Sequence, residues 1–330
     1  MYLHYMRAFR VLAIFCIVAG HTVDAFEWSN QDGIERLLRI FISNGSCFFI
    51  FIAGYLFQHL SNKYDTITYY KAKISHVVLP YLLMSLPAIF TFTFVMERES
   101  VWAGFYDQPV WIQVGWFYAT GTHLAPLWFV PMISIFYVLA PVLIREDRSR
   151  RLYYFLPVSI ALSLLVARGG PVQSFVHFFS AYLIGMACSH FKGMLQPVFT
   201  KLAFLLPMLT LSVLAGLIEY ELNDGTMTAW NYSQKVFGSL FLLGLLSRFN
   251  EWLTSDFLKI LADTSFVVFF LHSYVITAIK IICMQEFGSL PSGSFVMVLL
   301  ASCAVLALCV LMVQVIKKLT GRRSRQVIGC

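Results

Sequence analysis

The sequence predicts an all-α fold, a polytopic bundle of about ten transmembrane helices with both termini in the cytoplasm. Of its 330 residues, 59% are hydrophobic and only 12% are charged, and the mean hydropathy is +0.74. A soluble domain carries about 25% charged residues because its surface is hydrated. The apolar residues are grouped in windows long enough to cross a bilayer, and the basic residues are concentrated on one side of those windows.

A helix needs about 20 mostly apolar residues to cross roughly 30 Å of hydrocarbon. Ten windows approach this length, of which the fifth and the eighth are short. No internal repeat or low-complexity linker stands out, so we expect residues 1–330 to form a single transmembrane domain without a separate soluble domain, ending in a short basic cytoplasmic tail at 317–330. In chain order the windows cover residues 8–26, 37–57, 77–96, 127–144, 153–166, 175–189, 202–218, 236–249, 258–283 and 295–316.

The first window has an alternative interpretation as a cleaved signal peptide. Arg7 and Arg10 precede its apolar stretch, and Val23-Asp24-Ala25 loosely resembles a cleavage site. The motifs described below favour a helix that is retained.

The distribution of charge predicts the orientation. With the N-terminus inside, eighteen of the 24 Lys and Arg residues lie on the cytoplasmic side and six lie in outer loops. This is the cytoplasmic enrichment expected of a membrane protein. This asymmetry also accounts for the net charge of +7 and the pI near 9.0 without a nucleic-acid partner, which would need a basic face on a soluble domain. The six basic residues in outer loops are Arg36, Arg39, Arg98, Arg168, Lys235 and Lys280.

Neither a disulfide framework nor a metal site is expected. Six of the seven cysteines lie inside apolar runs, where they behave as small hydrophobic residues, and only Cys330 is in the tail. The eight histidines show no paired ligand spacing such as His-x-x-x-His. Neither a phosphate-binding glycine loop nor a Gly-x-Ser-x-Gly motif is present, so serine-hydrolase chemistry is not supported.

The first window contains Arg10 and His21, two groups that are costly to hold in hydrocarbon. Their separation of eleven residues corresponds to about 1100° of helix rotation, three turns plus about 20°, and to a rise of about 16 Å. Both side chains therefore lie on one face. Arg7 lies about 40° from His21 around the helix, on the side away from Arg10. Alternatively, the arginines extend to lipid headgroups and His21 is a neutral interfacial residue. Asp24 either orients His21 or is a solvated carboxylate.

The spacing of Arg10 and His21 resembles a signature of the acyltransferase 3 family, the integral-membrane O-acyltransferases of bacteria. Four further blocks in the same order strengthen the resemblance. The chain departs from the usual pattern at Ala53, where serine is common, at Lys73 and His76, where arginines are usual, and at Arg7, where an acidic residue is frequent. The blocks are FFIFIAGYLF at 48–57, YKAKISHVVLPYL at 70–82, LWFVP at 127–131 with Pro141 following, and DTSFVVFFLH at 263–272.

The resemblance implies an O-acyltransferase, most often an O-acetyltransferase, that moves an acyl group from cytoplasmic acyl-CoA to a hydroxyl of a cell-envelope or exported glycan, often a lipid-linked sugar. It implies a multi-pass protein of the bacterial cytoplasmic (inner) membrane that contacts membrane lipids and works alone or with glycan-assembly proteins. Acetyl-CoA would be a co-substrate, with no permanently bound cofactor and no nucleic acid. His21 and Arg10 are then the candidate catalytic residues.

Acyl-CoA is a polyanion with a long pantetheine arm, so its phosphates suit cations at the inner membrane surface. Arg7, Arg10, Lys73 and His76 fall at that surface and are the candidate donor-binding residues. The rise between Arg10 and His21 is comparable to the length of the arm. His21 could act as a general base on the acceptor hydroxyl or carry the acyl group transiently. For the lysines, the alternative is anchoring by the membrane surface.

Further polar and aromatic residues are candidates for lining a cavity. Ser265 and His272 are seven residues apart, which places them on one helix face about 10 Å from end to end. Hydrogen bonding between helices is the alternative role for Ser265, and packing or interfacial anchoring is the alternative for Trp128. His123 either lines the outer mouth or is a solvated loop residue. The cavity-lining candidates are Asp24, Tyr55, Trp128, Ser265 and His272.

Two other functions remain open. A transporter or flippase of lipid-linked sugars would use the same buried polar face as a path, and such proteins often interrupt helices at matching positions in their two halves. The nearest candidates, Asn44-Gly45-Ser46 and Gly169-Gly170-Pro171, do not correspond. A sensory or structural membrane protein would tolerate replacement of His21 without loss of turnover.

Overall fold

The computed structural model describes residues 3–28, 32–222 and 228–321. Within these ranges the secondary structure is helical and no strand forms; a single isolated bridge joins Glu27 to Ser292. The prediction of an all-α fold is therefore confirmed. Most of the predicted basic tail, residues 322–330, lies outside the described residues.

The helices follow one another with short connections, apart from the segment between α5 and α7. A π-helical turn, Ile74–Val78, joins α4 to α5. In chain order the helices are α1 (His4–Thr22), α2 (Asp32–Ile42), α3 (Ser46–His59), α4 (Thr66–Lys73), α5 (Leu79–Phe94), α6 (Val110–Thr120), α7 (Phe129–Arg148), α8 (Leu156–Leu165), α9 (Pro171–His190), α10 (Lys192–Phe199), α11 (Leu202–Leu222), α12 (Ala229–Arg248), α13 (Asp256–Phe287) and α14 (Phe295–Thr320).

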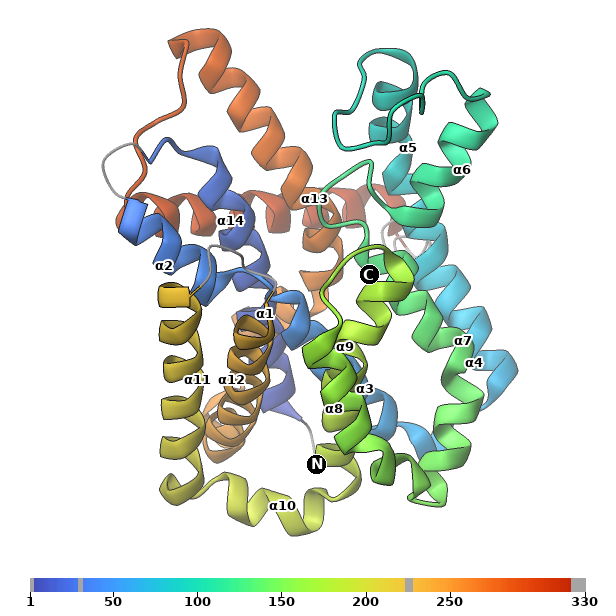
Figure 1. Ribbon diagram of the computed structural model, residues 1–330, viewed down its shortest axis with the longest axis vertical. Helices are drawn as coiled ribbons and strands as arrows, with labels where there is room; N and C mark the ends of the chain where they lie inside the picture. Colours follow the sequence, from blue (N-terminus) through green and yellow to red (C-terminus); the bar gives the residue numbers. More distant parts are fainter. Residues whose placement is uncertain (1–2, 29–31, 223–227, 322–330) are drawn as a thin grey trace.

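Eight helical segments of the described chain are long and apolar enough to cross a membrane. The two predicted windows outside this set are the short ones, which form α8 and α12. The first half of α12 carries Asn231, Gln234 and Lys235, all buried, which lowers its hydropathy. In Figure 1, α8 lies beside α9 and α12 beside α11. The eight segments are His4–Ala25, Gly33–His59, Thr66–Phe94, Phe129–Arg148, Pro171–His190, Leu202–Leu222, Asp256–Phe287 and Phe295–Leu319.

The predicted window 37–57 is not one continuous helix, which corrects the prediction. The chain breaks between α2 and α3, where Asn44 adopts a left-handed conformation with φ of 61°. Asparagine tolerates this conformation better than most residues because its short polar side chain can form local hydrogen bonds. The side-chain amide of Asn44 donates to Oδ1 of Asn231 on α12, 3.2 Å away, which ties the break to a second helix.

Lys235 holds the same break from α12. The prediction that Lys235 belongs to an outer loop is wrong, because its side chain is only 1% exposed. Its Nζ donates to the carbonyl oxygens of Ile40 at 3.1 Å and Phe41 at 2.7 Å, in the last turn of α2. Carbonyls at a helix C-terminus lack partners within the helix and carry partial negative charge, so they stabilise a buried cation.

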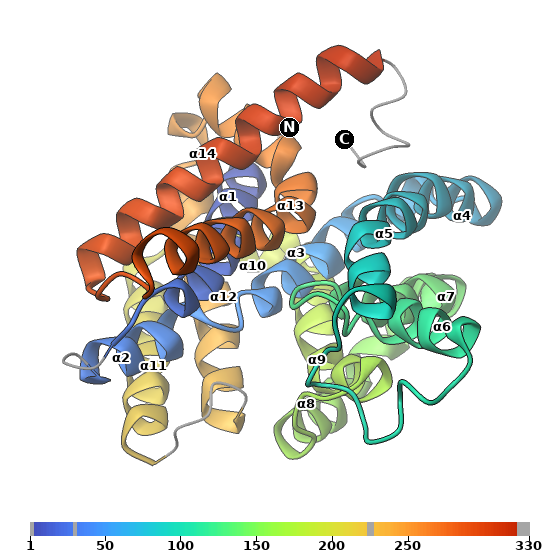
Figure 2. The same cartoon turned by 90° about the horizontal axis from the view of Figure 1, so that it is seen from above.

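The long helix α1 lies inside the bundle, where it packs against α3, α12, α13 and α14. It begins at the end of the molecule that carries α10 and finishes at the end that carries α2 (Figure 1). We call these the His4 end and the Asp24 end. Figures 1 and 2 show that α14 runs across the direction of α11 and α12 rather than along it. The cytoplasmic location of the His4 end stays a prediction.

Helices α3 and α9 approach each other closely, backbone to backbone, in this core. Gly54 on α3 faces the backbone of Tyr182, and Gly185 on α9 faces the backbone of Phe51. A Cβ at either glycine would overlap a backbone carbonyl of the neighbouring helix. Small residues at such crossings allow two helices to pack backbone to backbone. This contact places α3, and with it the break at Asn44, against the rest of the bundle.

Candidate active site

Arg10 contacts α13 near the His4 end. Its Nη2 donates to Oγ of Ser265 at 3.1 Å, and the Ser265 hydroxyl in turn donates to the carbonyl of Ala262 at 2.7 Å. Ser265 is fully buried, and Asp263 of the same helix lies close enough to interact electrostatically with Arg10. The guanidinium is therefore oriented by α13 rather than extended freely toward lipid headgroups.

His21 contacts α13 further along α1. The centres of the His21 and His272 rings are 5.2 Å apart, with the ring planes inclined at 41°. Nδ1 of His272 donates to the carbonyl of Val268 at 3.0 Å, and Nε2 is buried without a hydrogen-bond partner among the described residues. Because a carbonyl only accepts, this hydrogen bond selects the tautomer of His272 with a free lone pair on Nε2.

A cavity of about 270 Å³ opens beside His21 at the Asp24 end. Its walls come from the last turns of α1, the break between α2 and α3, the segment before α7, and the connection between α8 and α9. The lining combines polar groups, such as the side chains of Asn44 and Ser46, with the aromatic rings of Trp128 and Phe269. The lining residues are Cys16, Ile17, Gly20, His21, Asp24, Arg39, Ser43, Asn44, Gly45, Ser46, Ala125, Pro126, Trp128, Arg168 and Phe269.

Asp24 lines this cavity, but its carboxylate is engaged by Arg39. Nη1 of Arg39 lies 2.7 Å from Oδ1 of Asp24, and Nη2 lies 2.7 Å from Oε1 of Glu35. Asp24 and His21 interact electrostatically without a hydrogen bond between them in the described chain. The two carboxylates outweigh the single charge of Arg39, so this corner of the cavity does not attract an anionic group.

Arg168 and Trp128 also line the cavity. The Arg168 guanidinium lies 4.6 Å from the centre of the Trp128 ring, and Trp128 stacks at 6.0 Å on Phe178 of α9. Stacking of this kind stabilises a guanidinium on an aromatic face. Burial lowers the pKa of Arg168 to about 10, so the group is still charged at neutral pH. Arg168 is also close enough to His21 to interact with it electrostatically.

The candidate donor-binding residues divide between two elements. Arg7 and Arg10 lie on α1, whereas Lys73 ends α4 and His76 lies in the π-helical turn. Nζ of Lys73 lies 4.5 Å from the centre of the Tyr137 ring, on the wall of a cavity of about 530 Å³. Most of that wall is aromatic or aliphatic, with Lys63 and Asp65 near the connection between α3 and α4.

Three of the five cavity-lining candidates lie outside the lining of the His21 cavity. Tyr55 shares a hydrogen bond of 2.7 Å with the hydroxyl of Tyr5 and borders a separate, much smaller space near Lys192. Ser265 and His272 stand behind the wall, in contact with Arg10 and His21 respectively. Asp24 and Trp128 line the cavity directly.

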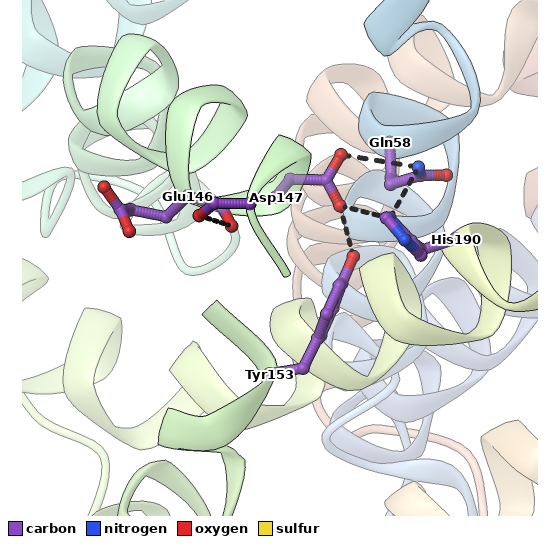
Figure 3. Close-up of polar contacts among 6 residues, drawn as sticks. Gln58, Glu146, Asp147, Tyr153 and His190 are labelled. Carbon is purple, nitrogen blue, oxygen red and sulfur yellow. Dashed lines mark hydrogen bonds and ion pairs between the residues drawn. The ribbon is translucent and has the colours of Figure 1, made fainter. Parts of the chain in front are cut away.

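A second polar cluster lies at the His4 end, away from the cavity (Figure 3). The buried carboxylate of Asp147 accepts hydrogen bonds from the hydroxyl of Tyr153 and from Gln58, and it contacts Nδ1 of His190 at 2.8 Å. Gln58 also lies 3.4 Å from Nδ1 of His190. These residues come from α3, α7, the turn before α8, and α9, so the cluster joins four elements. We assign it a structural role.

The sequence reasoning missed Arg168 and Asn44 as site residues. Both lie next to glycines, in Asn44-Gly45-Ser46 inside the window 37–57 and in Arg168-Gly169-Gly170 between the windows 153–166 and 175–189. A polar residue beside a glycine, within a window or between two, was the available signal, because a break in a span exposes backbone and side-chain groups to a cavity. Among the described residues, no group of three or more His, Cys, Asp or Glu side chains could hold a metal ion.

The fold and the site define a multi-pass membrane protein with a histidine at a partly polar cavity near one end of the bundle and an arginine nearer the other end of the same helix. A family model described as an acyltransferase domain matches residues 3–314, nearly the whole chain. The chain belongs to this acyltransferase 3 family, which makes it a membrane acyltransferase. Neither a curated protein nor a solved structure matches the chain.

Proposed function

We propose that this protein is an O-acetyltransferase of a bacterial cytoplasmic membrane. It takes the acetyl group from cytoplasmic acetyl-CoA and transfers it to a hydroxyl of a cell-envelope or exported glycan, often one that is lipid-linked. The observation that carries the proposal is the position of His21 on the wall of a polar cavity, with Arg10 on the same helix toward the other end.

The transfer step needs a base and a route for the leaving group. The neutral imidazole of His21 removes the proton of the acceptor hydroxyl while the oxygen attacks the thioester carbonyl. The tetrahedral intermediate collapses with cleavage of the carbon–sulfur bond. The departing CoA thiolate then takes the proton from the His21 imidazolium. In the alternative sequence, a nitrogen of His21 attacks the thioester, the carbon–sulfur bond breaks, and the CoA thiolate takes the proton that the acyl-imidazolium loses. The acyl-imidazole then passes its acetyl group to the hydroxyl, whose proton returns to the imidazole.

His272 supports His21 in either sequence. Its Nδ1 is committed to the carbonyl of Val268, and its ring lies against that of His21. The contact restricts the rotation of the His21 ring, and a neutral neighbour avoids repulsion when His21 becomes charged. We regard His272 as a positioning residue.

Donor binding is proposed at the His4 end. Arg10, oriented by Ser265, and Arg7 supply guanidinium groups for the phosphates of CoA, and Lys73 and His76 supply further basic groups. The rise of about 16 Å from Arg10 to His21 allows the pantetheine arm to span the two groups. The cavity beside Lys73, with its aromatic wall, is a candidate for holding part of the donor.

The proposal is tested with purified full-length protein in liposomes, acetyl-labelled acetyl-CoA and a glycan extract. We expect His21→Ala to lower acetyl transfer about 10²-fold to 10⁴-fold, the usual contribution of a general base. Arg10→Ala should instead raise the KM for acetyl-CoA by about tenfold or more, because a charged hydrogen bond is lost. His59→Ala, an exposed histidine at the His4 end, is the matched control and should leave both constants unchanged.

If no variant releases CoA with the extract present, or if all release it at the same rate, the catalytic assignment is wrong. Transport of lipid-linked sugar across the liposome membrane is then the activity to measure, with the same three variants.

A further inference from the structure

A second cavity adjoins the His21 cavity at the Asp24 end. It has a volume of about 260 Å³ and shares Ala125, Trp128 and Arg168 with its neighbour. The stacked pair of Trp128 and Arg168 therefore forms the wall between the two spaces. Arg98, from the segment after α5, also lines the second cavity.

Arg98 and Arg168 are both half-buried, and neither forms an ion pair with a described residue. The Arg98 guanidinium lies 5.0 Å from the centre of the Phe92 ring, and its Nε is buried without a hydrogen-bond partner in the described chain. Burial lowers the pKa of both arginines. Glu97 and Glu99 flank Arg98 in the sequence, but their side chains are exposed.

No acidic residue lines the second cavity within the described chain. Two guanidinium groups with reduced hydration and no carboxylate are costly in free energy. Arg39, which also lines the His21 cavity, has two carboxylates within 2.7 Å. The contrast indicates that the missing counter-charge of Arg98 and Arg168 is supplied by a ligand. Arginine favours phosphate and carboxylate because its planar group can donate two parallel hydrogen bonds to either.

We propose, on the basis of the proposed function, that the acceptor is anionic. A phosphate or carboxylate group of the acceptor binds in the second cavity between Arg98 and Arg168. A hydroxyl of the adjoining sugar then passes over the Trp128 face into the His21 cavity. Arg98 and Arg168 thus select acceptors that carry an oxyanion next to the sugar that is acetylated. Neutral glycans are poor acceptors.

The test measures binding without turnover. Full-length protein in nanodiscs of neutral lipid, with CoA at saturating concentration to occupy donor phosphate sites, is titrated calorimetrically with three probes. They are inorganic pyrophosphate, methyl glucuronide and the neutral methyl glucoside. The variants are Arg98→Gln, Arg168→Gln and Arg168→Lys, and Lys280→Gln on α13 is a control that removes one charge from the same end of the bundle.

We expect at least one anionic probe to bind the wild type, and the glucoside not to bind. Each glutamine variant should weaken that binding at least about tenfold, the equivalent of one charged hydrogen bond. Arg168→Lys should keep part of the affinity for the anionic probe, and Lys280→Gln should keep all of that affinity. Tighter binding of pyrophosphate would indicate a phosphate-linked acceptor, and tighter binding of methyl glucuronide would indicate a carboxylated one. Size-exclusion profiles identify any variant that does not fold, and the remaining arginine variants then decide the result.

The proposal is overturned if neither anion binds, or if both bind the folded glutamine variants as tightly as the wild type. It is also overturned if phosphatidylglycerol in the nanodisc abolishes the arginine-dependent binding, because a lipid headgroup is then the occupant. CoA release is measured on separate portions of the same preparations, with acetyl-CoA in place of CoA and with the glycan extract added. Arginine-dependent anion binding without CoA release would reject the proposed function and leave only the anion site. CoA release without anion binding would reject only the anionic acceptor.

Discussion

Three buried histidines have the same hydrogen-bonding pattern and different surroundings. In His123, His177 and His272, Nδ1 lies within 3.0 Å of a backbone carbonyl, and Nε2 is buried without a partner among the described residues. His123 packs on Tyr81 and Phe117, and His177 packs on aromatic rings as well. Only His272 of the three faces another imidazole, that of His21. The neighbour, not the hydrogen bond, distinguishes a site residue from a core residue.

His123 makes stability depend on pH. Burial lowers its pKa to about 4 in the folded protein, whereas the unfolded chain has the ordinary value of about 6.5. When the pH falls below the pKa of His123 in the unfolded chain, the unfolded state binds a proton there and the folded state does not. His123 should therefore reduce the free energy of unfolding by about 2 kcal/mol between pH 7.5 and pH 5.

The measurement compares thermal unfolding of the wild type with that of His123→Asn at the two pH values. Asparagine keeps a side-chain N–H for the carbonyl of Phe117 and does not titrate in this range. The variant should lose less stability on acidification than the wild type. Equal losses would show that His123 is hydrated in the folded protein.

At the scale of elements, the break between α2 and α3 depends on contacts from two other helices. Lys235 and Asn231 of α12 bind the carbonyl end of α2, and α9 holds α3 through Gly54 and Gly185. The residues from Ser43 to Ser46 that line the His21 cavity are therefore held from both sides. A shift of α3 against α9 would change the cavity without altering any residue in it.

Gly54→Ala and Gly185→Ala should each destabilise the protein, because the new methyl group would overlap a backbone carbonyl of the facing helix. Overpacking of this kind costs about 1–3 kcal/mol. Gly115→Ala in α6 is the control, since its Cβ would meet no atom within 4 Å, and it should be neutral or slightly stabilising. Unfolding midpoints in detergent measure the difference. Wild-type stability of the Gly54 and Gly185 variants would contradict the close helix contact.

At the scale of the whole molecule, the two ends of the bundle have different chemistry. The His4 end carries the arginines between 145 and 151 and the cavity beside Lys73. The Asp24 end carries the two adjoining cavities around Trp128 and Arg168. A donor of acyl groups made in the cytoplasm and an acceptor outside would meet near His21, if the His4 end is cytoplasmic as the basic residues predict.

Reporter fusions on either side of α7 test this orientation. Alkaline phosphatase, which is active only outside the cytoplasm, should be active when fused after Gln108 and inactive when fused after Ser149. Green fluorescent protein should give the opposite result. A reversed pattern would place Arg10 at the outer surface and remove the basis for its role in binding a cytoplasmic donor.

Much of this protein follows from its sequence alone. The lengths of the apolar windows, the helical spacing of Arg10 and His21, and the order of the motif blocks are local properties, set by the helix repeat and by bilayer thickness. They were sufficient for the all-α membrane fold and the family. The tertiary structure decided which residues meet: Ser265 with Arg10, His272 with His21, Lys235 with the end of α2, and Arg98 with Arg168 across one cavity. These contacts join segments far apart in the chain, and their geometry depends on the packing of several helices at once, which no local spacing encodes.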